Sequence, residues 1–121
     1  MSFQVITLIG TIQACQDTGV VPIATNIFPT DILKKNYFAS LSFNDPHWYI
    51  QNILKEVCDS VMQRTNKEIH PFQVGINWVR AKGAIPLPTV RTEQEAMDII
   101  TSLSFTLNTE EVELLDNAKR E

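Results

Sequence analysis

Residues 74–92 read VGINWVRAKGAIPLPTVRT, and this passage decides the fold. It runs from an amphipathic helix, through a glycine stop at Gly83, into a short apolar stretch and then into a polar turn that opens another helix. The apolar stretch, Ala84–Leu87, is short enough to predict a strand. A helix, a strand and a second helix in close succession are typical of a fold in which strands and helices alternate.

A similar passage lies near the start of the chain. Apolar residues between Val5 and Ile12 recur at helical spacing, and Gly19 is expected to end this helix. The run Val20–Ala24 is continuously apolar, as in a buried parallel strand. Because proline has no N–H, Pro22 places this strand at a sheet edge or leaves one bond missing from its ladder.

Four further helices are expected from apolar spacing and from their first residues. Pro71 suits a first helical turn, after which Val74, Trp78 and Val79 face inward. Each of the last two helices is expected to open with a capping box, a pair of reciprocal side chain–backbone hydrogen bonds. One helix is expected from the apolar residues Ile50, Ile53, Leu54, Val57 and Val61, and it ends at Thr65-Asn66. In the next, Thr92 and Glu95 form the capping box, and the apolar residues are Ala96, Ile99, Ile100 and Leu103. In the last, Asn108 and Glu111 form the capping box, and the apolar residues are Leu114 and Leu115.

These elements predict an α/β fold with two parallel strands and about five helices. We expect the strands to lie side by side, joined by a right-handed crossover through the helices between residues 48 and 82. At 121 residues the chain is predicted to form a single domain, residues 1–121. Residues 25–48 have no stable period and are predicted to be a long loop, which in a compact domain is usually functional or disordered.

Composition excludes several classes of function. The net charge of −4 and a pI near 5.1 argue against a nucleic-acid partner, whose phosphates call for a basic surface. No apolar run approaches the ~20 residues of a membrane span, and no signal peptide is recognisable, so a soluble protein is expected. The compartment stays open. Cys15 and Cys58 have no CxxC or histidine-rich companion, which predicts buried free thiols and no metal site.

Residues 74–92 resemble the last helix–strand–helix passage of the aldo-keto reductases. The similarity extends to residues 12–24 and to residues 103–116, so that roughly 100 residues are covered. Family members are eight-stranded β/α barrels that reduce carbonyls with NADPH. The resemblance implies that residues 20–24 and 84–87 are the seventh and eighth strands of such a barrel. Since a whole barrel needs about 250 residues, residues 1–121 would form a partial (β/α) barrel remnant, its C-terminal half.

The resemblance also implies which residues would bind a cofactor. Arg91 matches the arginine that meets the 2′-phosphate of NADPH, Thr92 matches the helix-opening position, and Asp98 stands where the family commonly has Glu. Without a cofactor, these would be a surface charge, a helix cap and a solvated carboxylate. Other positions depart from the family pattern: Thr89 for Gly, Glu95 for Gln, Ile99 for Asn, and Thr25-Asn26-Ile27-Phe28-Pro29 for the loop that cradles the pyrophosphate.

No catalytic residue is predicted. The family's catalytic Asp, Tyr, Lys and His lie upstream of everything matched. Tyr37 and Tyr49 have no Lys or His in a supporting context, and His47 and His70 resemble loop and cap residues. The chain by itself is therefore not expected to reduce a carbonyl.

Three hypotheses of function follow. The first is a non-catalytic structural or interaction subunit, docked on other protein subunits through residues 25–48 and the open edges of its sheet. The alternative is the C-terminal NADPH-binding portion of a split or truncated reductase. The third is a small standalone module with a weakened nucleotide pocket. The changes in both cofactor loops favour the first hypothesis and predict no cofactor in this chain, with NADPH only if the site is retained.

Overall fold

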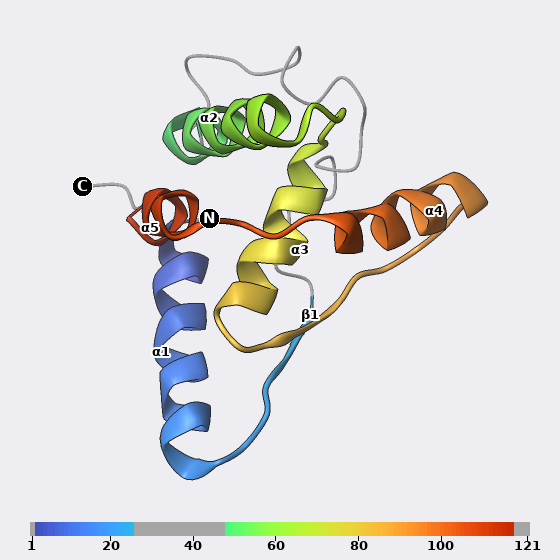
Figure 1. The fold of residues 1–121 in the computed structure, drawn as a ribbon. Helices are drawn as coiled ribbons and strands as arrows, with labels where there is room; N and C mark the ends of the chain where they lie inside the picture. Colours follow the sequence, from blue (N-terminus) through green and yellow to red (C-terminus); the bar gives the residue numbers. More distant parts are fainter. Residues whose placement is uncertain (1, 26–47, 118–121) are drawn as a thin grey trace.

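Five α-helices and two short strands make up the part of the chain that the computed structural model describes, residues 2–25 and 48–117 (Figure 1). This confirms the predicted α/β fragment. The elements, in order, are α1 (Ser2–Thr18), β1 (Ile23–Thr25), α2 (Trp48–Thr65), α3 (Pro71–Ala81), β2 (Ile85–Leu87), α4 (Glu93–Thr101), the 3-10 turn η3 (Ser102–Ser104) and α5 (Thr109–Asp116).

The two strands pair in parallel, as predicted. Ile23 lies opposite Ile85, and Thr25 lies opposite Leu87. The first strand begins at Ile23 and not at Val20, because the backbone N–H of Val20 still donates to the carbonyl of Cys15 in the cap of α1, at 2.9 Å. Residues committed to a helix end cannot also join a sheet ladder, so the strand is shorter than the apolar run.

Among the described residues, only one face of this sheet is covered. Ala24 is buried at 6% exposure, whereas Ile23, Ile85 and Leu87 are 62%, 51% and 58% exposed. The expectation of a buried strand is therefore wrong for this second face. A sheet of two strands with helices on one side leaves every second side chain in contact with solvent.

Helix α3 is the centre of the structure. It contacts α2, α4, α5, η3 and β2, and Figure 1 shows it in the middle of the structure, with α2 at its start and with α5 and α4 on either side. Every residue from Pro71 to Val79 is buried, including the predicted inward residues Val74, Trp78 and Val79. The apolar core around α3 consists of Ile12, Ala24, Leu54, Val57, Cys58, Val61, Ile69, Phe72, Val74, Ile76, Trp78, Val79, Ala84, Phe105 and Leu115.

The ends of the helices follow the predicted stop signals. Gly19 and Gly83 have φ values of +74° and +88°, in the left-handed region that glycine adopts without a steric penalty. At Gly83 the close approach of another helix adds a second constraint. Gln16 of α1 donates from its Nε2 to the carbonyl of Lys82 at 3.0 Å, and a Cβ added at Gly83 would lie 2.8 Å from that nitrogen.

Two expectations about burial are wrong. Ile99 packs against the core, but Ile100 and Leu103 of the same predicted stripe are each 61% exposed. The reason is that, among the described elements, α4 packs mainly against α3 and η3, so that one side of it is covered. Cys58 is fully buried as expected, whereas Cys15 is only partly buried.

Other expectations fall outside the described residues. The predicted long loop, residues 25–48, lies there except for its ends, which belong to β1 and α2. Among the helices that are described, none combines the length and the apolar character needed to cross a membrane.

A pair of glycine substitutions tests the junction between α1 and α3. Gly83→Ala should lower the free energy of unfolding by about 1–2 kcal/mol, because it places a Cβ in the left-handed region and against Gln16. Gly10→Ala is the matched control: nothing lies within 4 Å of its added Cβ, and alanine inside α1 should raise stability by about 0.5–1 kcal/mol. Urea denaturation measures the free energy of unfolding of both variants. Equal changes in the two would contradict the close approach of Gln16 to Gly83.

Candidate functional site

The start of α4 is the candidate cofactor site. Thr92 is the N-cap of this helix, and its hydroxyl accepts the backbone N–H of Glu95 at 3.1 Å. Its carbonyl also accepts the N–H of Ala96 at 3.1 Å, the first turn of the helix. Of the two reciprocal bonds of the expected capping box, the structure forms the one from the N–H of Glu95 to the hydroxyl of Thr92. The Thr92 side chain is therefore already used by its own helix, whatever else it binds.

The charge around this helix start is unfavourable for a phosphate. Arg91 is exposed and directly precedes the cap, so it could reach an anion placed there. The first turn, however, carries the two carboxylates Glu93 and Glu95. Carboxylates at this position are stabilised by the free N–H groups and the dipole of the helix, and they compete with an external anion for both. One arginine against two carboxylates leaves the site net negative.

Asp98, the third predicted cofactor residue, lies apart from the other two. It is six residues beyond Thr92, about 9 Å further along the helix axis. Its carboxylate accepts a hydrogen bond from Nε2 of Gln94 at 2.9 Å, and its carbonyl accepts one from Nε2 of Gln73 at 2.9 Å. The structure thus brings Arg91 and Thr92 together, and places Asp98 where α4 meets α3.

Two buried polar residues of α3 hold α4 and η3 in place. Gln73 donates to the Asp98 carbonyl and accepts the N–H of His70 at 2.9 Å, so that both ends of its amide are satisfied. Asn77 donates to the carbonyl of Ser102 at 2.8 Å. Each is 2% exposed. Sequence reasoning missed both residues, although polar side chains spaced i, i+4 on the inner face of an apolar helix were a signal for them.

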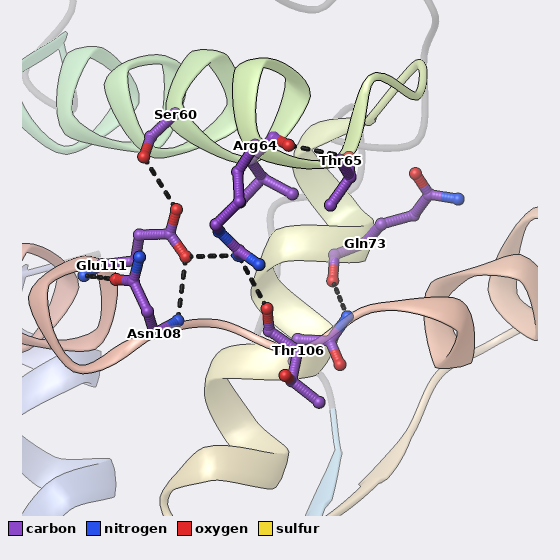
Figure 2. Close-up of polar contacts among 9 residues, drawn as sticks. Ser60, Arg64, Thr65, Gln73, Thr106, Asn108 and Glu111 are labelled. Atoms are coloured by element: carbon purple, nitrogen blue, oxygen red, sulfur yellow. Dashed lines mark hydrogen bonds and ion pairs between the residues drawn. The ribbon is translucent and has the colours of Figure 1, made fainter.

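A buried carboxylate joins α5 to α2 (Figure 2). Glu111 is 2% exposed, and its carboxylate accepts three hydrogen bonds: from Oγ of Ser60 at 2.8 Å, from Nη2 of Arg64 at 2.8 Å, and from the backbone N–H of Asn108 at 2.9 Å. Glu111 was predicted as part of a capping box with Asn108, and that box is confirmed. Its links to α2 were missed, because they join residues about 50 positions apart.

The end of α5 is tied to α3 by a second carboxylate. Asp116 accepts from Nε1 of Trp78 at 2.8 Å through one oxygen and from Nζ of Lys82 at 2.8 Å through the other. The Trp78 ring is buried, as predicted for a core residue, and its only polar atom is satisfied. The carboxylates of Glu111 and Asp116 therefore serve the packing of helices and are not directed at a ligand.

Cys58 and His70, two further chemistry-bearing residues of the described part, have roles in the fold. Burial raises the pKa of the Cys58 thiol from 9.0 to about 12, and the charge of Asp59 adds to the rise, so the thiol stays protonated at neutral pH. His70 caps α3, as expected. Within residues 2–25 and 48–117, no three His, Cys, Asp or Glu side chains are grouped so as to hold a metal ion.

The exposed face of the β1–β2 sheet is a second candidate site. Besides Ile23, Ile85 and Leu87, the approach to β1 exposes Val20 and Val21, at 57% and 64%. Scattered apolar side chains on a surface are normal, but these five are gathered on one small sheet and the segment that leads into it. A surface of this kind is suited to contact with another macromolecule.

Comparison with known proteins identifies one family. The family model described as the aldo/keto reductase family matches residues 8–120. Comparison with curated proteins and with solved structures found no match. The matched residues include all three predicted cofactor residues and both strands of the sheet.

Glu111 provides a test of how α5 is held. Glu111→Ala should lower the free energy of unfolding by about 2–3 kcal/mol, because Ser60 and the N–H of Asn108 lose this acceptor and Arg64 keeps only the carbonyl of Thr106. Arg64 is 39% exposed and can recover hydration, which keeps the cost below that of a fully buried pair. The control Glu110→Ala, at an exposed neighbouring position, should cost no more than about 1 kcal/mol. Equal losses in urea denaturation would contradict the network.

Proposed function

This chain belongs to the aldo/keto reductase family, and on that premise we propose that it is a non-catalytic subunit that docks on other proteins through its open sheet. The observation that carries the proposal is the uncovered apolar face of β1 and β2. Residues 25–48 were predicted to contribute to the same contact, and they lie mostly outside the described residues.

The energetics of the sheet support a partner. Fully burying a Val, Leu or Ile side chain stabilises a protein by about 1.5–3 kcal/mol, and the side chains of this face are half to two thirds exposed. Against a total stability of about 5–15 kcal/mol, covering five such side chains is a large gain. A two-stranded sheet is also marginal by itself, so a partner that extends or covers it stabilises the fold as well as the complex.

The start of α4 supports a role without a cofactor. Two acidic residues lie in the first turn of α4, where the phosphate of a dinucleotide would bind, and the hydroxyl of Thr92 already accepts the N–H of Glu95. Ile99, which stands where the family commonly has an Asn, packs against the core and offers adenine no hydrogen bond. These features favour docking over nucleotide binding as the use of this surface.

One observation favours the alternative, a C-terminal NADPH-binding portion of a split or truncated reductase. Arg91 is exposed and directly precedes the N-cap of α4, where the resemblance expects the arginine of the 2′-phosphate site. A guanidinium beside free backbone N–H groups is a suitable anion ligand. The alternative therefore depends on whether this one cation outweighs Glu93 and Glu95.

The docking surface is tested by expressing a double variant and a control variant in the organism from which the chain comes. The wild-type protein should migrate in native gels and sedimentation as part of a complex larger than its own 13.7 kDa. The double variant Ile23→Ser with Leu87→Ser should shift to the monomer, since it makes the exposed face polar. Leu103→Ser, a control at an equally exposed position outside the sheet, should remain in the complex. A wild-type chain that is a stable, compact monomer would remove the physical basis of the proposal.

Calorimetry with NADPH separates the proposal from its alternative. The 121-residue chain should bind NADPH weakly, because the first turn of α4 is acidic and Ile99 makes no polar contact with adenine. Substituting Arg91 by Ala should change this little, and Lys55→Ala, which removes an exposed cation on α2, serves as the control. Micromolar or tighter binding that is lost in Arg91→Ala would support the alternative.

A further inference from the structure

Helix α5 depends on its neighbours for its own structure. It comprises residues Thr109–Asp116 and packs against α2 and α3. A helix of two turns is not stable alone in water, because forming its first hydrogen-bonded turn costs more than so few residues return. Two of its residues are buried, the charged Glu111 and the apolar Leu115, and Val112 is half-buried beside the core. The folding of α5 and its docking are therefore one event.

A charged contact attaches the start of α5 to α2. The carboxylate of Glu111 accepts hydrogen bonds from Oγ of Ser60 and from Nη2 of Arg64 (Figure 2). The same Nη2 donates to the carbonyl of Thr106 at 2.8 Å, in the segment that leads into α5. Arg64 therefore holds both the helix and the residues before it, and its partly exposed side chain is accessible to water and ions.

A second charged contact attaches the end of α5 to the end of α3. The carboxylate of Asp116 accepts from Nζ of Lys82 and from Nε1 of Trp78. The side chains of Lys82 and Asp116 are both partly exposed. In this pair, as in that of Arg64, the carboxylate belongs to α5 and the cation to the structure that it covers. Because salt screens exposed charges, a higher ionic strength weakens both pairs.

Helix α3 is held in a different way. Its residues from Pro71 to Val79 are buried, and the amides of Gln73 and Asn77 make its contacts to α4 and η3 without charge. Salt screens charges and leaves bonds between uncharged groups nearly unchanged. Segments with few buried apolar contacts also open at a lower free energy than the core. We therefore expect α5 to open more easily than α3 and to respond more strongly to salt.

We propose that α5 is a latch: it opens and closes as one unit while α2 and α3 stay folded, and its ion pairs with Arg64 and Lys82 hold it closed. Opening frees the indole N–H of Trp78 and uncovers the part of the core around Leu115. Raising the ionic strength shifts the latch toward its open state. This inference goes beyond the proposed docking function and does not depend on it.

Amide hydrogen exchange of the 121-residue chain, followed by NMR, tests the latch. The amides of Val112 and Asn117, which donate to the carbonyls of Asn108 and Glu113, report on α5. After correction for intrinsic rates they should exchange about tenfold or more faster than amides in the middle of α3. Raising KCl from about 0.02 M to about 0.5 M should speed them about threefold and leave α3 unchanged. The indole N–H of Trp78 should follow the α5 amides.

Two matched variants separate the ion pair from the charge of the helix. Asp116→Asn and Glu113→Gln each remove one negative charge from the second half of α5. Asp116→Asn weakens the contact with Lys82 and should speed the exchange of the α5 amides about fivefold, with a smaller effect of salt than in wild type. Glu113 is exposed, and Glu113→Gln should leave these rates within about a factor of two.

Three results would overturn the proposal. If the α5 amides exchange at the rate of the α3 amides, α5 opens only when the whole chain unfolds. If Asp116→Asn and Glu113→Gln have equal effects, the pair with Lys82 does not hold the helix closed. If exchange in α5 does not change with KCl, the ion pairs do not control its opening.

Discussion

The burial of α3 is the constraint on which the rest of the structure depends. A helix that is covered on every side normally carries apolar residues all round, yet Gln73 and Asn77 lie inside. Their burial is tolerable because each amide reaches a backbone group of the segment that packs against it, the carbonyls of Asp98 and Ser102. The same bonds orient α4, and so they decide where Arg91 and Thr92 lie.

The carboxylates of α5 complete this arrangement. Glu111 binds two side chains of α2, and Asp116 binds Trp78 and Lys82 at the far end of α3. The helices are thus held together by polar contacts between residues that are far apart in the sequence. The sheet has no comparable support, since its outer face is open in the described part of the chain. Within the described residues, the helices are joined by buried and charged polar contacts, whereas the sheet keeps three of its apolar side chains more than half exposed.

At the start of α4, family membership favours a cofactor site, whereas the local charges oppose one. The match over residues 8–120 relates the chain to reductases that use a dinucleotide, and Arg91 retains a cation at the expected place. The two carboxylates beside it and the half-covered sheet favour a contact with protein instead. A phosphate group is bound best by cations and free backbone N–H groups, and carboxylates in the first turn of the helix compete with it for both.

The succession of elements could be predicted from the sequence, because local signals set it. Gly19, Pro71, Gly83, Thr92 and Asn108 begin or end helices through backbone conformation and capping, which act within a few residues. It also predicted the parallel pair of strands, although β1 is shorter because the cap of α1 takes the N–H of Val20. Only the tertiary structure decided which apolar residues are buried: Ile99 but not Ile100, and Ala24 but not Ile23. The same holds for Gln73, Asn77 and Glu111, whose partners lie 25 to 51 positions away, since hydrophobic spacing describes one element and burial depends on what packs against it.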